Sequence, residues 1–285
     1  MIVITGASGQ LGRQVITELL KKLPAAEIVA AVRDPNKVAD LAAQGVQVRV
    51  ADYNQPATLE SAFKGADKVL LISSNELGQR VTQHGHVIDS AQKAGVTLLA
   101  YTSILHANSS PLALAEEHKE TEALIKASGL PYVLLRNGWY TENYLASVPT
   151  ALQHGVLIGS AANGQIGSAA RADYAAAAAV VLTEVNQAGK VYELAGDDAY
   201  TLTDLAAEIS RQSGKHVTYQ NLPKAEFKNA LIGAGLPEAF AELLADSDLG
   251  ASQGGLFDNS HQLSQLIGRP TTPLAGMIKT LYENA

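Results

Sequence analysis

The sequence predicts an α/β fold, in which a doubly wound parallel sheet of the Rossmann type is followed by a smaller, mainly helical C-terminal domain. The first observation is that strand-like and helix-like segments alternate through the first half of the chain. The second is the N-terminus, where a β-branched run at residues 2–4 leads into three glycines and an apolar segment at residues 11–23. Such alternation implies right-handed crossovers that place helices on both faces of one sheet.

Each predicted element depends on local composition and periodicity. Short apolar runs predict strands at residues 2–4, 27–32, 46–50, 68–72, 96–101, 132–135 and 190–194. Helical patterns predict helices at residues 11–23, 36–43, 58–63, 79–94, 112–128 and 172–184. Gly95 and Gly129 directly follow two of these helices, which is the position where a glycine ends a helix.

The pattern is less regular in the second half of the chain. Residues 137–157 are predicted to be loop and short helices, and residues 164–169 loop or strand. From residue 201 the chain is predicted to be mainly helical with Thr203 as an N-cap, and 250–255 is the loosest stretch, a candidate mobile lid. We therefore expect a nucleotide-binding domain at 1–150, completed by sheet segments within 151–195, and a helical, substrate-side lobe at 196–285.

Composition excludes several classes of function. The 285 residues are 47% hydrophobic and 17% charged, which is typical of a soluble globular protein. The net charge of −7 gives no general attraction to nucleic acid or to an anionic membrane. The absence of cysteine excludes disulfides, a thiol nucleophile and thiolate-bound zinc. Met1 leads straight into a strand without a signal segment, so we expect a cytoplasmic protein without membrane insertion. We also expect it to be a monomer or homodimer.

The glycine-rich turn has the composition of a phosphate-binding turn. Gly6 permits a backbone conformation that a side chain forbids, Gly9 allows a pyrophosphate to approach, and Gly12 allows close packing of helix and strand. The N–H groups from Gln10 onward would face the phosphates. The alternatives are a tight turn that binds nothing and a serine nucleophile elbow, but the latter needs glycine at position 10. The predicted cofactor-binding residues here are Gly6, Ala7, Ser8, Gly9, Gln10, Leu11 and Gly12.

The residue after the second strand predicts which dinucleotide is bound. An acidic residue at this place selects NAD through the ribose hydroxyls, but Arg33 occupies it here. A guanidinium suits a 2′-phosphate, which favours NADP(H). The alternative is that Asp34 turns inward while Arg33 is an ordinary surface charge.

Polar residues follow two further strands. Asp52 and Tyr53 are expected beside the adenine, and a second group is expected along the middle of the cofactor, although residues of these types also favour ordinary turns. That second group is Ser73, Ser74 and Asn75. His84 and His86 are two residues apart on a predicted helix and point to different faces, so we expect no catalytic metal.

The glycine-rich turn and the polar residues after the strands are accompanied by further characteristic segments at 130–132, 136–143, 268–270 and 273–274. Together they make the sequence resemble the NmrA-like branch of the atypical short-chain dehydrogenases. The resemblance covers essentially the whole chain, and within the branch it is strongest to bacterial NADPH:quinone oxidoreductases. It implies a Rossmann domain with a small C-terminal domain, NADPH bound along the strand ends, and a quinone reduced in the cleft between the domains.

One departure from the wider superfamily bears on the chemistry. The usual catalytic tyrosine lies four residues before a lysine, but position 115 is Ala115 while Lys119 is present. Lys119 is therefore a weak catalytic candidate that would reach the nicotinamide ribose, and its alternative role is a solvated helix face. The resemblance implies that a further segment, Asn137, Gly138, Trp139 and Tyr140, lines the substrate and cofactor pocket. Tyr140 is the second weak catalytic candidate, although a buried aromatic is often simply core.

The main functional hypothesis is a quinone reductase that transfers a hydride directly from NADPH. Quinone reduction tolerates the loss of the tyrosine, because the product oxygens take protons from water or a weak donor and the reaction gains aromaticity. No flavin is required by this chemistry. The alternative from another class is an NADP(H)-sensing regulator that acts through a protein partner without catalysis, and a third possibility is a reductase of other conjugated carbonyls.

Overall fold

The computed structural model describes residues 1–283, and in it the chain divides into two compact units. The first unit consists of Met1–Ala107, Glu116–Asn137 and Arg171–Tyr192. The second consists of Asn108–Ala115, Gly138–Ala170 and the chain from Glu193 onward. Both units are thus assembled from segments that are distant in sequence, and they divide at other points than the predicted limits of 150 and 196.

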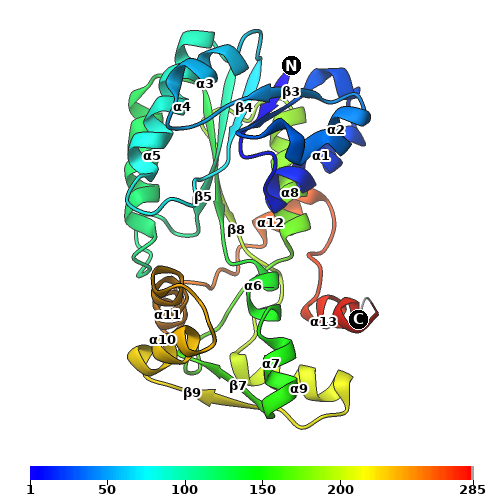
Figure 1. The fold of residues 1–285 in the computed structure, drawn as a ribbon, viewed down its shortest axis with the longest axis vertical. Helices are drawn as coiled ribbons and strands as arrows, with labels where there is room; N and C mark the ends of the chain where they lie inside the picture. Colours follow the sequence, from blue (N-terminus) through cyan, green and yellow to red (C-terminus); the bar gives the residue numbers. More distant parts are fainter. Residues whose placement is uncertain (284–285) are drawn as a thin grey trace. The chain divides into compact units, whose positions relative to one another are not determined.

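A seven-stranded sheet with the order β3-β2-β1-β4-β5-β6-β8 organises the first unit (Figure 1). β1 pairs in parallel with both β2 and β4, β2 with β3, and β5 with both β4 and β6. The strand order reverses between β1 and β4, which is the place where open parallel sheets bind ligands. The predicted fold class is confirmed. The strands are β1 (Ile2–Ile4), β2 (Ile28–Val32), β3 (Gln47–Val50), β4 (Lys68–Leu71), β5 (Leu98–Ile104), β6 (Tyr132–Asn137) and β8 (Val191–Leu194).

Helices cover both faces of this sheet, as the alternating pattern predicts (Figure 1). α1 (Gln10–Leu20) and α8 (Arg171–Thr183) pack together on one face, where the alanines of α8 permit close contact. The opposite face carries α3 (Pro56–Ala62), α4 (Arg80–Ala94) and α5 (Ala115–Ala127). The short elements that flank β2 are η1 (Ala25–Glu27), η2 (Pro35–Val38) and α2 (Ala39–Ala43).

A hydrophobic core of the first unit lies between the sheet and the helices of this opposite face, α3, α4 and α5. Alternate strand residues face it, because side chains of a strand point to opposite faces in turn. These buried residues include Val3, Val29, Val69, Leu71, Leu99, Tyr101 and Leu134, with Leu59, Phe63, Val87, Ile88 and Ile125 from the helices. Since helices cover both faces, β1, β2 and β5 are buried along their whole length, which explains their nearly continuous apolar sequence.

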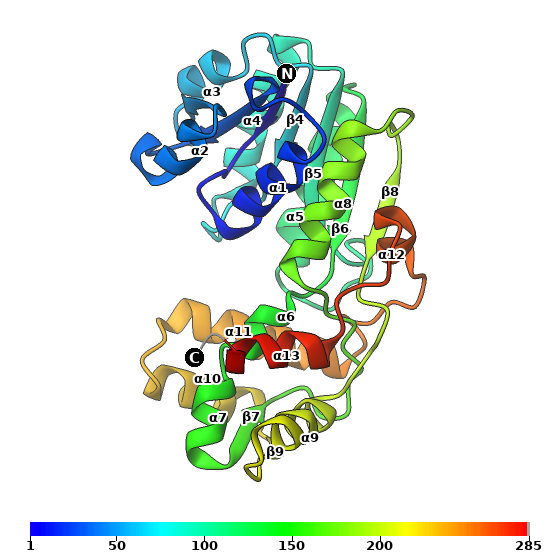
Figure 2. The same cartoon turned by 90° about the vertical axis from the view of Figure 1, so that its right-hand side faces the viewer.

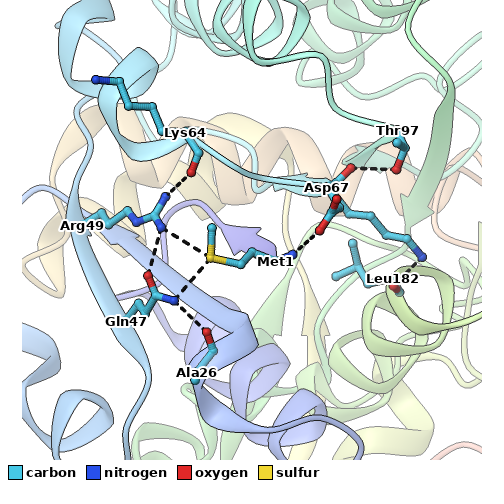
Figure 3. A network of polar contacts seen from close by, with 9 residues as sticks. Met1, Ala26, Gln47, Arg49, Lys64, Asp67, Thr97 and Leu182 are labelled. Carbon is cyan, nitrogen blue, oxygen red and sulfur yellow. Dashed lines mark hydrogen bonds and ion pairs between the residues drawn. The ribbon is translucent and has the colours of Figure 1, made fainter.

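A polar network joins the amino ends of the strands (Figure 3). The ammonium group of Met1 pairs with Asp67, and Gln47 and Arg49 each contact the Met1 sulfur. Arg49 also donates to the carbonyl of Lys64 at 2.8 Å. This network holds β1, β3 and β4 together at the sheet edge opposite to the carboxyl ends.

The second unit is mainly helical, as predicted, but it also contains a small parallel sheet (Figure 2). β7 (Val156–Gly159) pairs with β9 (Thr218–Asn221), and neither strand was predicted. β9 is largely exposed, so it lacks the apolar alternation that reveals a strand. The helices are α6 (Thr141–Leu145), α7 (Val148–His154), α9 (Leu202–Ser213), α10 (Lys224–Gly233), α11 (Glu238–Ser252), α12 (Gln262–Ile267) and α13 (Leu274–Glu283).

Two local predictions in this unit were wrong. Thr201, not Thr203, caps α9, because only Thr201 has an acidic residue three positions later to complete a capping box with Asp204. The stretch 250–255 is not loose. α11 continues to Ser252, and a Cβ at either Gly250 or Gly255 would approach the Leu112 side chain within 2.7 Å, so these glycines permit close packing.

Within residues 1–283, no helix is long and apolar enough to cross a membrane.

Candidate functional site

The turn after β1 has the geometry that its glycines predict. Gly6 adopts a left-handed conformation with φ of +58°, which side chains disfavour. A Cβ at Gly12 would lie 2.6 Å from the Gly6 carbonyl oxygen and 2.7 Å from the Ala7 Cα. Gly12 therefore permits α1 to pack against the backbone of the turn itself, rather than against the strand as expected.

The N-terminus of α1 has no side-chain cap. Gly9 occupies the N-cap position and offers no acceptor for the N–H groups of the first turn. α1 is 11 residues long. The free N–H groups of its first turn and the positive end of its dipole lie together at the glycine turn. This arrangement suits a phosphate.

The Tyr53 hydroxyl contacts a side chain and a backbone carbonyl next to the glycine turn. Its hydroxyl lies 2.5 Å from Thr5 Oγ1 and 2.8 Å from the carbonyl oxygen of Ile72. Burial of this hydroxyl raises the pKa of Tyr53. The side chain thus joins the ends of β1 and β4 next to Gly6, whereas the sequence led us to expect it beside an adenine. Asp52 accepts from Asn54 N–H at 2.9 Å and so serves its own turn.

The loop between β4 and α4 holds Ser73, Ser74 and Asn75, and its backbone is fixed by side chains from neighbouring elements. Ser73 N–H donates to Thr102 Oγ1 at 2.9 Å, and Ser74 N–H donates to His84 Nε2 at 3.0 Å. Arg80 Nε donates to the carbonyl of Ser74 at 2.6 Å. The loop is therefore presented in a defined shape beside the glycine turn at the switch point.

The residues that fix this loop form a buried polar cluster between α4, α5 and β5. His118 lies 2.7 Å from the Tyr101 hydroxyl and 3.4 Å from Arg80 Nη1, and His84 Nδ1 lies 2.9 Å from Thr121 Oγ1. Because His84 Nε2 accepts from Ser74, its Nδ1 carries the proton and donates to Thr121. Burial and then the charge of Arg80 lower the pKa of His84 to about 3, so the ring is neutral at physiological pH.

Sequence reasoning missed this cluster, although a signal was present. Arg80, Gln83 and His84 lie at helical spacing on the same face of α4 as the buried Val87 and therefore point inward. Polar side chains on an apolar helix face indicate a network that the apolar periodicity alone does not reveal.

A second buried pair connects α5 with β5 and β6. Arg136 donates to both carboxylate oxygens of Glu122, at 2.8 and 2.7 Å, and Ser103 Oγ donates to the same carboxylate at 2.7 Å. Burial raises the pKa of Glu122, but these hydrogen bonds outweigh that effect, and the pKa is lowered overall. The charged pair, together with Ser103, connects α5 to the carboxyl ends of β5 and β6.

Arg33 lies at the end of β2 with 71% of its side chain exposed, and its Nη1 contacts Glu76 Oε1 at 3.2 Å. The neighbouring Asp34 accepts from Asn36 N–H at 3.0 Å as the cap of η2. Asp34 is thus used by its own turn, which leaves Arg33 as the residue that presents charge beyond β2.

The two weak catalytic candidates differ in their surroundings. Lys119 is half exposed, and its Nζ is 3.6 Å from Glu116 on the same helix, while Ala115 is buried. Tyr140 is half-buried and belongs to the second unit with Trp139, which is 9% exposed. Gly138 N–H donates to the carbonyl of Leu194 at 2.7 Å, and a single parallel bridge joins Tyr140 to Ala169.

Asn137 ends β6 in the first unit and carries an unusual polar atom. The residue is 6% exposed, and its Oδ1 is buried without a hydrogen-bond partner among the described residues. A buried amide oxygen without a donor costs free energy. Across the part of the chain that the structure describes, no three His, Asp or Glu residues are placed to hold a metal ion.

In the first unit, the predicted cofactor residues other than Lys119 on α5 lie at the carboxyl ends of β1, β2, β3, β4 and β6, and the strand order brings these ends along one edge of the sheet. Only the Gly138–Tyr140 part of the predicted set belongs to the second unit.

Comparison with known proteins adds relatives over the full length. Residues 1–274 match the NmrA-like family. Quinone oxidoreductase 2 of Escherichia coli is 61% identical over 283 residues, which are 99% of each chain. The crystal structure of the E. coli NADPH-dependent quinone oxidoreductase complexed with NADPH superposes with a TM-score of 0.97 at 61% identity, covering 99% of this chain and 100% of the other. A triphenylmethane reductase from Citrobacter sp., complexed with NADP(H), is 40% identical with a TM-score of 0.95, covering 98% and 99%.

Proposed function

This chain belongs to the NmrA-like family, and we propose that within it the protein is an NADPH-dependent quinone reductase. The observation that carries the proposal is the likeness to the E. coli quinone oxidoreductase, which extends over 99% of the chain at 61% identity and includes the NADPH complex. At this identity the activity of the relative is a stronger guide than fold alone. We place the protein in the cytoplasm as a monomer or homodimer.

The residues of the first unit fit the cofactor. The uncapped N-terminus of α1 and the left-handed Gly6 offer N–H groups and space for the pyrophosphate. The exposed guanidinium of Arg33 suits the 2′-phosphate, which it binds through paired N–H donors. We assign contact with the middle of the cofactor to the loop of Ser73, Ser74 and Asn75. The unpaired oxygen of Asn137 is the acceptor that we assign to a hydrogen-bond donor near the nicotinamide.

When bound, NADPH supplies the hydride that reduces the quinone ring. The protein binds and orients the two reactants, which raises the rate by proximity. Ala115 provides no acidic hydroxyl where related dehydrogenases have one, and the quinol oxygens can take their protons from water. Lys119 and Tyr140 stay candidate residues for contacts with the ribose and with the substrate.

The test is a mixture of purified protein, NADPH and a small benzoquinone without added flavin, followed at the nicotinamide absorbance band. We expect protein-dependent loss of NADPH that saturates with the quinone. Tight NADPH binding without any protein-dependent loss would instead support the alternative from the sequence, a regulator that senses NADP(H). A triphenylmethane dye in place of the quinone shows whether the substrate range extends to the acceptor named for the Citrobacter relative.

A further inference from the structure

Glu76 lies in the loop between β4 and α4 and places a carboxylate directly on Arg33. Its Oε1 is 3.2 Å from Arg33 Nη1. Its Oε2 accepts from Gln83 Nε2 at 2.6 Å and is 3.5 Å from Asn54 Nδ2. One glutamate therefore connects the loops after β2, β3 and β4 at the edge where the cofactor is proposed to bind.

The position of Glu76 is fixed from the side of α4. Gln83 is 1% exposed, so its short hydrogen bond holds the carboxylate from within the fold. This bond also dictates the orientation of the Gln83 amide, because the opposite orientation would place the amide oxygen against the carboxylate. In consequence Gln83 Oε1 is buried without a partner in the described residues. The arrangement costs free energy at a binding edge, where such costs usually serve function.

The contact has a direct consequence for the recognition of a 2′-phosphate. Glu76 is the hydrogen-bonding partner of Arg33 within residues 1–283 and contacts its Nη1, so an arriving phosphate shares the guanidinium with it. The phosphate also meets a fixed negative charge beside the guanidinium. The 2′-hydroxyl of NADH meets neither obstacle, because a carboxylate accepts a hydrogen bond from it.

We infer that Glu76 is a specificity-determining residue that competes with the 2′-phosphate for Arg33 and limits the preference for NADPH over NADH. The inference deepens the proposed function and rests on its assignment of Arg33. Both side chains are substantially exposed, 71% for Arg33 and 44% for Glu76, so the competition is modest. It is also sensitive to salt, because exposed charges are screened.

The test measures binding of 2′,5′-ADP and 5′-AMP to the full chain by calorimetry, which requires no turnover. We expect Glu76→Gln to strengthen binding of 2′,5′-ADP by about two- to fivefold at low salt and to leave binding of 5′-AMP nearly unchanged. In roughly 0.5 M salt the gain should largely disappear. Glu60→Gln is the matched control: Glu60 is 45% exposed and paired with Lys93 at 2.6 Å, so it alters net charge equally. This control should leave both affinities unchanged.

The outcomes separate the inference from the proposed function. If wild-type protein prefers 2′,5′-ADP and Glu76→Gln leaves that preference unchanged or weakens it, the role of Glu76 is overturned while the quinone reductase proposal stands. An equal gain in Glu60→Gln overturns it too, because the effect would then be general electrostatics. If wild-type protein does not distinguish the two nucleotides, the assignment of Arg33 fails, and the role of Glu76 fails with it.

Discussion

At the scale of single residues, Arg33 is the residue to which we assign the preference for NADPH. Its guanidinium is mostly exposed at the end of β2, and Asp34 is occupied by its own turn. We expect Arg33→Ala to weaken NADPH binding by about 10- to 100-fold, the value of a hydrogen bond to a charged group, and to leave NADH binding nearly unchanged. Titration of both nucleotides against variant and wild type measures this. An unchanged ratio of the two affinities would refute the assignment.

Asp248 is a buried carboxyl in the second unit whose protonation is expected to make stability depend on pH. It lies in α11, where its carboxylate accepts from Tyr144 Oη at 3.1 Å and from Ser160 N–H at 2.8 Å. Burial raises the pKa of Asp248 from 3.8 to about 6, against the opposing effect of these two bonds. The native state therefore holds the proton more tightly than the unfolded chain does. This contribution to stability is complete below pH ~4 and is lost as the pH rises through ~6.

Asp248→Asn tests this pH dependence, because the amide does not titrate. Relative to the variant, we expect the unfolding free energy of the wild type to fall by about 2 kcal/mol between pH ~4 and pH ~7. Urea denaturation followed by circular dichroism at several pH values gives the difference. Parallel pH profiles for the two proteins would show that Asp248 has an ordinary pKa in the fold.

At the scale of elements, the junction of β1 and α1 depends on close contact between backbones. A Cβ at Gly12 meets backbone atoms of Gly6 and Ala7 at 2.6 and 2.7 Å, so the turn must shift to admit it. We expect Gly12→Ala to weaken NADPH binding by at least about tenfold and to destabilise the fold, since the displaced turn carries the phosphate-binding N–H groups. Fluorescence titration with NADPH and urea denaturation measure the two effects.

Gly85 provides the control for that substitution. It lies inside α4, and a Cβ there meets nothing within 4 Å. Gly85→Ala should leave NADPH binding unchanged and stabilise the protein by about 0.5–1 kcal/mol, because alanine loses less backbone entropy in a helix. If Gly12→Ala binds NADPH as well as Gly85→Ala does, close packing at the turn is not needed for the site.

The elements also show where local pattern was sufficient and where it was not. Strands buried on both faces have continuous apolar sequences, so β1, β2 and β4 were predicted to within a residue or two. β9 escaped prediction because it is polar and largely exposed, and the short apolar run of β7 was not recognised at the end of a segment predicted to be loop and short helices. The α9 cap was misplaced by two residues, because the capping box depends on the pairing of Thr201 with Asp204 rather than on threonine alone.

At the scale of the whole molecule, each compact unit is built from separate stretches of chain. α8 comes late in the sequence but packs on the sheet with α1, and 108–115 belongs to the unit that holds most of the C-terminal third. Amino-acid composition changes little where the chain passes from one unit to the other. Sequence patterns therefore locate a domain boundary only where the periodicity of apolar residues changes abruptly. The comparisons with relatives, in contrast, span essentially all of the chain.

The sequence by itself determined the parallel α/β sheet, the glycine turn and the basic residue after β2, because each depends on residues that are neighbours in the chain. Strand periodicity, a positive φ at Gly6 and a charge at a strand end are local properties. Only the tertiary structure decided that Glu76 lies between Gln83 and Arg33, and that Arg80 and His84, with His118 behind Arg80, fix the loop after β4. These contacts join residues 30 to 50 positions apart or lie on helix faces whose partners depend on strand order, which no local pattern specifies.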